Sequence, residues 1–207
     1  VLRELEASGR IPAVPIYLDS PMAVEALGVH KKYFSDLNLD CRKKSLQDIE
    51  LFRPRHLNLS VTRQQSQKIN EVSEGAIIIS ASGMCAGGRI LHHLQQRLPD
   101  EKNTVLIIGY QAEGTRGRSL VEGRETLRMF GEDVPVKAHL ERIEGFSGHA
   151  DYAELLAWLL GFNKKPERVF LVHGEGDASE SMAKKIRQHF KWDVSVPTEG
   201  SHALLAF

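Results

Sequence analysis

Short apolar runs alternate with segments of helical character along most of this chain. The runs at residues 14–18, 76–79, 104–108 and 168–172 have the length of single buried strands, and turn residues follow them. Strands that alternate with helices through short turns favour a mostly parallel sheet, because each helix returns the chain to the start of the next strand. We therefore predict an α/β fold.

The other elements are predicted from caps, glycines and periodicity. Ser20 or Asp19 can cap a helix that begins near Pro21 and runs through Tyr33. Further strands are expected at residues 57–61, 134–143 and 194–196. Further helices are expected at residues 1–9, 62–70, 89–97, 151–160 and 179–190.

The segment at residues 111–125 differs from its neighbours, because it is rich in Gly, Arg and Glu and has no apolar period. We interpret it as a surface connection and a candidate domain boundary, followed by a second α/β unit. Its basic residues, Arg116, Arg118 and Arg124, are interpreted as part of a solvated loop, with contact to an RNA backbone as the alternative.

Size and charge narrow the function classes. The chain has 207 residues, 42% of them hydrophobic, which is enough for one sizeable core or two small ones. Its 27 basic and 27 acidic residues balance, so a global basic field for nucleic acid is absent. Two isolated cysteines favour a reducing, cytoplasmic location. No apolar run approaches the length of a membrane span, so no membrane partner is expected.

Two histidines beside glycines are the strongest candidates for chemistry. His173 ends the apolar run at residues 169–172, and strand ends are where α/β proteins form their sites. His149 precedes a helix, where Ser147 or Asp151 can serve simply as the cap. Imidazole can ligate a metal or transfer a proton near neutral pH. We expect the two histidines to meet in one site for hydrolytic chemistry.

A glycine-rich turn at residues 83–88, between a buried strand and a helix, is a candidate anion site. Hydroxyls such as that of Ser82 and backbone N–H groups near Gly83 can bind phosphate, and Arg89 can add a bidentate contact. Close packing of the helix on the strand is the alternative, since it also requires glycine. No Gly-Lys-Ser/Thr string follows, so this is not a Walker loop.

Several other polar residues are given structural interpretations. Asp19 is interpreted first as a helix cap, with a substrate or structural contact as the alternative. His92 and His93 are interpreted as an ordinary helix surface. Structural or solvent-facing roles are expected for the remaining histidines, which are His30, His56, His139, His189 and His202.

Five segments, taken in order, resemble the β-CASP group of metallo-β-lactamase-fold nucleases, in the branch related to the mRNA 3′-end cleavage factor. They are Val14-Pro15-Ile16-Tyr17-Leu18-Asp19-Ser20-Pro21-Met22-Ala23, Ser82-Gly83-Met84 with Gly87-Gly88-Arg89, Gly109-Tyr110-Gln111 with Gly114-Thr115, Gly145-Phe146-Ser147-Gly148-His149-Ala150-Asp151, and Val172-His173-Gly174-Glu175. The resemblance implies a Rossmann-like β-CASP sheet at residues 1–130. It also implies that residues 131–207 are the C-terminal portion of a metallo-β-lactamase αββα sandwich, of the RNA-metabolising type.

The resemblance also implies roles for single residues. His149 matches the histidine that protonates the leaving oxygen, and His173 matches a ligand of one of two zinc ions. Ser147 matches a position near the substrate phosphate. The loop that carries Ser82, Gly83 and Arg89 would face the RNA cleft.

The main metal motif of the resembled family, His-x-His-x-Asp-His, does not occur in the sequence. A catalytic zinc needs about three protein ligands, and only His173 matches one. We therefore expect the chain to begin partway through the inserted domain. Alone it would bind zinc weakly and cut little, whereas the full-length protein would hold two zinc ions.

The function expected from the resemblance is zinc-dependent hydrolysis of RNA phosphodiester bonds, in RNA processing or decay. The expected partner is RNA in single-stranded form, and a homodimer is left open. The alternative is a non-catalytic RNA- or nucleotide-binding α/β module, or a scaffold subunit.

Overall fold

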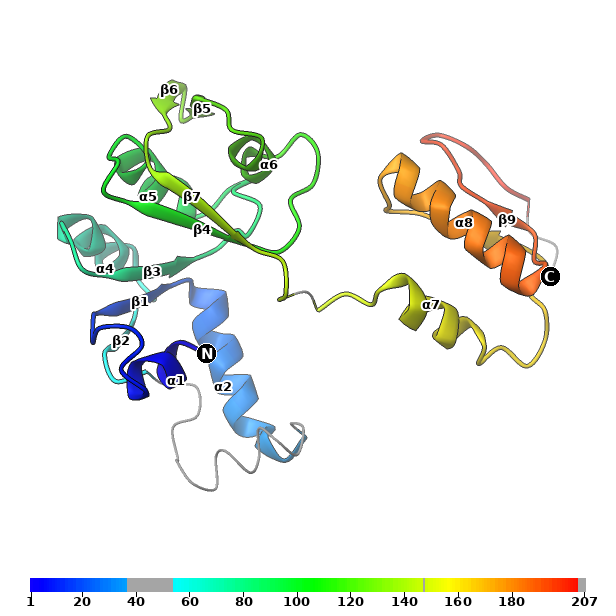
Figure 1. Ribbon diagram of the computed structural model, residues 1–207, viewed down its shortest axis with the longest axis horizontal. Coiled ribbons are helices and arrows are strands. Elements are labelled where there is room, and N and C mark those ends of the chain that lie inside the picture. The colour runs from blue at the N-terminus through cyan, green and yellow to red at the C-terminus, as the bar shows by residue number, and fades with distance from the viewer. Residues whose placement is uncertain (37–53, 147, 205–207) are drawn as a thin grey trace. The chain divides into compact units, whose positions relative to one another are not determined.

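The computed structural model describes residues 1–36, 54–146 and 148–204. The chain divides into two compact units, Val1–Phe146 and Ser147–Phe207, called unit 1 and unit 2 below. Both contain helices and parallel strands (Figure 1), so the predicted α/β class is confirmed. The predicted boundary between residues 130 and 131, and the sandwich expected after it, stay predictions. No helix in the described ranges is both long and apolar enough to cross a membrane.

Unit 1 begins with a three-stranded parallel sheet. It consists of β1 (Ile16–Asp19), β2 (Leu57–Leu59) and β3 (Ile77–Ser80), in the order β2-β1-β3. The central strand β1 is the most buried, with Ile16 1% exposed and Leu18 8% exposed. All three strands were predicted, although β2 ends two residues earlier than expected.

Helices precede, connect and follow these strands. They are α1 (Leu2–Ala7), α2 (Pro21–Lys32), the 3₁₀ turn η1 (Phe34–Asp36), α4 (Arg63–Lys68), the 3₁₀ turn η2 (Ile69–Glu71) and α5 (Ile90–Arg97). Ser20 caps α2 by accepting a hydrogen bond from the backbone N–H of Ala23. Thr62 and Gln65 form a capping box at the start of α4, which explains why so polar a segment is helical.

A second pair of parallel strands follows α5. It joins β4 (Thr104–Ile108) to β7 (His139–Ile143), in a register that pairs Thr104 with His139. Between them lie α6 (Arg116–Val121) and an antiparallel hairpin of β5 (Thr126–Met129) and β6 (Glu132–Pro135). Ten buried residues form the core here, among them Leu98, Leu120 and Met129, each 0% exposed.

The prediction of a surface connection at residues 111–125 was wrong. The segment contains α6, whose Leu120 is fully buried, and its Gln111 is 3% exposed. The apolar residues of this short helix, Leu120 and Val121, are adjacent and do not repeat at helical spacing, so no period in the sequence indicated the helix. The single strand predicted at residues 134–143 is two strands, β6 and β7, which pair with different partners.

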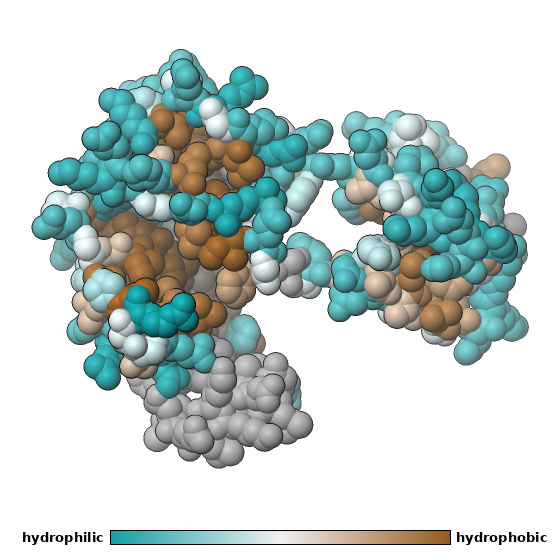
Figure 2. Space-filling model, viewed as in Figure 1, coloured by the Kyte–Doolittle hydropathy of each residue, from teal (hydrophilic) through white to brown (hydrophobic). Residues whose placement is uncertain are grey.

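Unit 2 is small. It contains α7 (Tyr152–Leu159), β8 (Val169–Phe170), α8 (Gly176–Phe190) and β9 (Val194–Ser195), with β8 parallel to β9. Five buried residues make its core: Leu156, Leu159, Ala183, Ile186 and Val194. Large apolar side chains stay exposed, such as Trp158 at 67% and Leu160 at 72%. Figure 2 shows hydrophobic residues at the surface of both units.

Candidate functional site

The strand order places a candidate site at the carboxyl ends of β1 and β3. β2 follows β1 along the chain and lies on one side of it, whereas β3 lies on the other side. The order in which strands are added to the sheet therefore reverses at β1. Ligands of open α/β sheets bind outside the strand ends at such a switch point. Asp19 ends β1 and Ser80 ends β3, and the two residues are paired in register.

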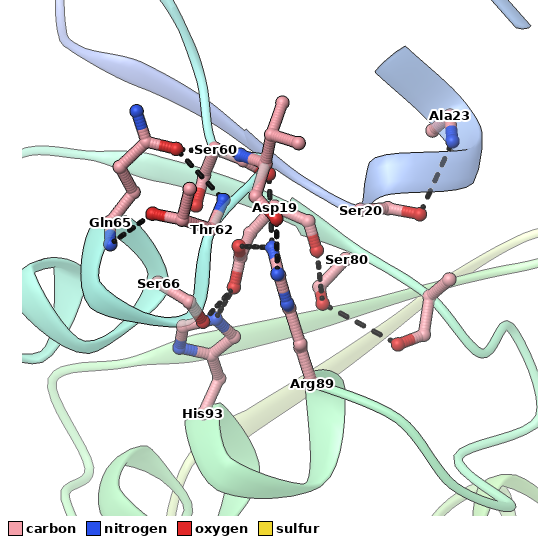
Figure 3. A network of polar contacts seen from close by, with 12 residues as sticks. Asp19, Ser20, Ala23, Ser60, Thr62, Gln65, Ser66, Ser80, Arg89 and His93 are labelled. Atoms are coloured by element: carbon pink, nitrogen blue, oxygen red, sulfur yellow. Dashed lines mark hydrogen bonds and ion pairs between the residues drawn. The ribbon is translucent and has the colours of Figure 1, made fainter. Parts of the chain in front are cut away.

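Asp19 is the centre of a buried polar network at this edge (Figure 3). Its side chain is 0% exposed. Oδ1 accepts a hydrogen bond from Arg89 Nη1 at 2.8 Å, and Oδ2 accepts from Ser66 Oγ at 2.6 Å and from His93 Nε2 at 2.7 Å. Burial by itself would raise the pKa of the Asp19 carboxyl, but hydrogen bonds led by that of Ser66 outweigh it and lower the pKa. Asp19 is therefore a carboxylate held by three donors.

The Arg89 guanidinium links the Asp19 network to the two residues that follow β2. Besides the contact with Asp19, Nη1 donates to the carbonyl oxygen of Ser60 at 3.0 Å and Nη2 donates to that of Val61 at 2.6 Å. Its side chain is 22% exposed. These contacts use three of its five N–H groups. The predicted bidentate phosphate contact of Arg89 stays a prediction, since it depends on the remaining donors.

Two interpretations made from the sequence were wrong at this site. Asp19 does not cap α2, because Ser20 does so and the Asp19 carboxylate faces α4 and α5. His93 does not lie on the helix surface, since it is 4% exposed and contacts Asp19, whereas His92 is exposed as expected. A signal was present, because Arg89 and His93 are four residues apart and so share one face of α5.

The glycine-rich loop at residues 82–88, called the 82–88 loop below, connects β3 to α5. Ser82 Oγ accepts from the backbone N–H of Ala86, and the Ser82 carbonyl oxygen accepts from that of Cys85. Gly88 has a φ of +81°, and a Cβ there would lie 2.9 Å from the carbonyl oxygen of Ala81. Gly88 thus serves close packing of helix on strand, the alternative that the sequence left open.

The region around α6 holds the outer side of this loop. Gln111 Nε2 donates to the carbonyl oxygen of Gly83 at 3.1 Å, and the backbone N–H of Gly117 donates to that of Met84 at 3.0 Å. Arg116 Nη1 donates to the Ala86 carbonyl oxygen at 3.3 Å. Arg116 thus does not belong to the solvated loop that the sequence suggested. Gly83 is exposed, and its binding to phosphate stays a prediction.

The two candidate histidines both lie in unit 2, each just before a helix. His149 is exposed and precedes Asp151, whose Oδ1 caps α7 by accepting from the backbone N–H groups of Ala153 and Glu154. His173 is exposed, with a φ of +66°, and lies three residues beyond β8, because the strand predicted at residues 168–172 ends at Phe170. Ser147, predicted to lie near the substrate phosphate, is outside the described residues.

Backbone geometry singles out the turn at His173. A non-glycine residue in the left-handed region persists only where its surroundings impose it, and such residues cluster at functional sites. A Cβ on the next residue, Gly174, would collide with Ser179 Oγ on the first turns of α8. The turn is therefore packed directly on α8, which fixes the position of the His173 backbone.

A complete metal centre does not occur within residues 1–36, 54–146 and 148–204. No group of three His, Cys, Asp or Glu side chains in these ranges could hold a metal ion. His173 alone does not fit a catalytic zinc, which needs about three protein ligands. The described residues thus do not match a whole zinc site.

Comparison with protein-family models gives two matches in tandem. The first is to the Beta-Casp domain, over residues 1–120, which is more than half of the chain. The chain belongs to the Beta-Casp family. The second match, over residues 133–197, is to a model described as the Zn-dependent metallo-hydrolase RNA specificity domain. The resemblance found in the motifs is thereby confirmed, and zinc belongs to the description of this family.

Curated relatives of this Beta-Casp chain carry names that concern RNA and transcription. A ribonuclease of Thermus thermophilus is 38% identical over 84% of the chain and 40% of its own length. The transcription termination factor FttA of Pyrococcus abyssi is 34% identical over 95% of the chain and 32% of its own length. An RNase J-like protein of Methanocaldococcus jannaschii is 34% identical over 94% of the chain and 44% of its own length. The chain thus spans less than half of each relative.

Proposed function

We propose that the whole protein is a zinc-dependent ribonuclease that hydrolyses RNA phosphodiester bonds in RNA processing or decay. One observation carries this proposal: a single chain matches the Beta-Casp model and the RNA specificity model of the Zn-dependent metallo-hydrolases in tandem. The name of the Thermus thermophilus relative, a ribonuclease, supports the same activity. The chain contributes the β-CASP part and the C-terminal part of the lactamase fold.

Two residues of unit 2 are proposed to act at the scissile bond. His149 donates a proton to the leaving sugar oxygen, a role that an exposed imidazole can fill. His173 supplies one ligand for one of two zinc ions, whose other ligands come from elsewhere in the whole protein. Ser147 lies near the phosphate in this proposal.

The 82–88 loop is proposed to contact the RNA backbone. Ser82 and Gly83 stand at its start, next to the switch point of the sheet, where α/β proteins bind ligands. Arg89 contributes the N–H groups that do not contact Asp19, Ser60 or Val61. The RNA is single-stranded in this proposal.

Cleavage of a labelled single-stranded RNA by the full-length protein tests the proposal. His149→Ala should lower kcat by about 10²- to 10⁴-fold, the usual contribution of a positioned acid. His189→Ala is the matched control, because His189 is an exposed histidine of the same unit, in the last turn of α8. Equal rates of RNA cleavage by the two variants would refute the role of His149 as the proton donor.

The same experiment separates the ribonuclease from its rival. A wild-type protein that binds the RNA but leaves it intact at saturating zinc would instead be the non-catalytic RNA-binding module. Sedimentation of the full-length protein decides whether it forms the homodimer that the sequence left open.

A further inference from the structure

Two residues that flank the 82–88 loop, Ser80 before it and Arg89 after it, both form a hydrogen bond with Asp19. At the start of the loop, Ser80 Oγ donates a hydrogen bond to the backbone carbonyl oxygen of Asp19 at 3.0 Å. At its end, Arg89 Nη1 donates to the Asp19 carboxylate at 2.8 Å. The loop has no regular secondary structure of its own, so its shape depends on such attachments.

Asp19 is itself fixed from several directions. Ser66 on α4 and His93 on α5 both donate to Oδ2, and the carboxylate is 0% exposed (Figure 3). Arg89 extends the network to the carbonyl oxygens of Ser60 and Val61, just beyond β2. The carboxylate thus links the end of β1, through Arg89, to the residues just beyond β2, whereas the backbone carbonyl oxygen of Asp19 links it to Ser80 at the end of β3.

Asp19 cannot contact RNA directly. Its carboxylate is inaccessible, and its negative charge would repel a phosphate. Loss of that charge would leave the Arg89 guanidinium, itself mostly buried, without its counter-ion. The guanidinium would then move toward water and would take the end of the loop with it.

We propose that Asp19 is a positioning residue, whose carboxylate acts through Arg89 to hold the 82–88 loop in the conformation that contacts the RNA backbone. The inference deepens the proposed function, on which it rests. It assigns to unit 1 a buried element that determines how tightly RNA binds, distinct from the histidines of unit 2.

The test uses the full-length protein with Asp19→Asn, which keeps the volume of the side chain and removes its charge. The amide N–H₂ of asparagine would face a donor, Arg89 or His93, in place of a carboxylate oxygen. KM for single-stranded RNA and the Kd measured without cleavage should both rise about tenfold or more, while kcat changes less than about threefold. Such a split marks an interaction made equally in the ground state and the transition state.

Arg97→Gln is the matched control. Arg97 lies at the other end of α5, where Nη2 donates to the carbonyl oxygens of Ile69 and Val72 at 2.8 and 3.0 Å. Its loss removes guanidinium–carbonyl contacts from the same helix without touching the loop. Arg97→Gln should lower the melting temperature yet leave KM and Kd within about twofold of wild type.

Ser66→Ala covers the case in which Asp19→Asn does not fold. It removes one of the three donors to the Asp19 carboxylate at a residue outside the loop, so KM and Kd should again rise, by less than in Asp19→Asn. An unchanged KM and Kd in a folded Asp19→Asn variant or in Ser66→Ala, or the same rise in Arg97→Gln, would overturn the inference. A wild-type protein that neither binds nor cleaves RNA would instead refute the proposed function. If the wild-type protein binds RNA without cleaving it, the comparison of Kd between wild type and the variants tests the inference.

Discussion

Gly88 offers the sharpest test of how the 82–88 loop is held. A Cβ at this position would lie 2.9 Å from the carbonyl oxygen of Ala81, and the φ of +81° is left-handed. Left-handed backbone costs a non-glycine residue about 1–2 kcal/mol, and overpacking costs about 1–3 kcal/mol more. Gly88→Ala should therefore destabilise the loop by about 2–5 kcal/mol. Gly123→Ala is the control, because Gly123 has a φ of +78° and nothing within 4 Å of its added Cβ.

The thiol of Cys85 supplies the assay, since it lies within the loop and is 3% exposed. Burial raises the pKa of this thiol, against the opposing charge of Arg116, so a thiol reagent reacts only when the loop opens. In a Cys41→Ser background, the labelling rate in native buffer reports the free energy of opening. The Cys85 thiol should be labelled at least about 30-fold faster in Gly88→Ala than in the protein with glycine at this position. In Gly123→Ala, labelling should be at most about 30-fold faster. A Gly88→Ala rate no higher than that of Gly123→Ala would refute the reasoning.

Two further predictions concern carboxylates. Asp151→Ala should lower the unfolding free energy of unit 2 by about 1 kcal/mol through loss of the α7 cap, and Asp151→Ser should restore most of it. Tryptophan fluorescence measures this, because Trp158 and Trp192 both lie in unit 2. The lowered pKa of Asp19 means that its carboxylate stabilises the fold above the ordinary value of 3.8 and loses this contribution as pH falls through the folded value. The midpoints of urea unfolding of wild type and Asp19→Asn should differ by a constant amount above about pH 5, and the difference should become smaller below about pH 4. A difference at about pH 2 as large as that at neutral pH would contradict this.

Local pattern was sufficient for most of the strands. β1, β3 and β4 are each a short apolar run followed by a turn, and such runs have few alternatives to a buried strand. The same approach failed at β6 and β7, because it took one stretch of extended residues for one strand. Phe130 and Gly131 both have positive φ, which makes the two-residue turn of a β5–β6 hairpin, and a glycine between extended runs is the signal that indicates it.

Local pattern indicated only one part of the Asp19 network, the helix face that Arg89 and His93 share, and did not connect it to Asp19. Asp19 is separated along the chain by 47 residues from Ser66, by 70 from Arg89 and by 74 from His93. No periodicity or spacing relates residues so far apart, and only the packing of α4 and α5 beside the sheet brings them together. The general rule that a buried charge needs partners implies such a network once the burial of Asp19 is known, but burial is itself a result of the fold.

Backbone conformation gives an independent reason to regard the family motifs as functional. Among the described residues, the non-glycine residues with positive φ are Cys85, Phe130, His173 and Lys191. Two have ordinary structural causes, since Phe130 belongs to the hairpin turn and Lys191 ends α8 in a left-handed cap. The other two lie in the 82–88 loop and at the proposed zinc ligand, and each costs about 1–3 kcal/mol that no hairpin or helix end explains. Strain at His173, a motif residue of unit 2, and at Cys85, which lies between two motif segments of unit 1, favours a site-building role for both segments over a purely structural one.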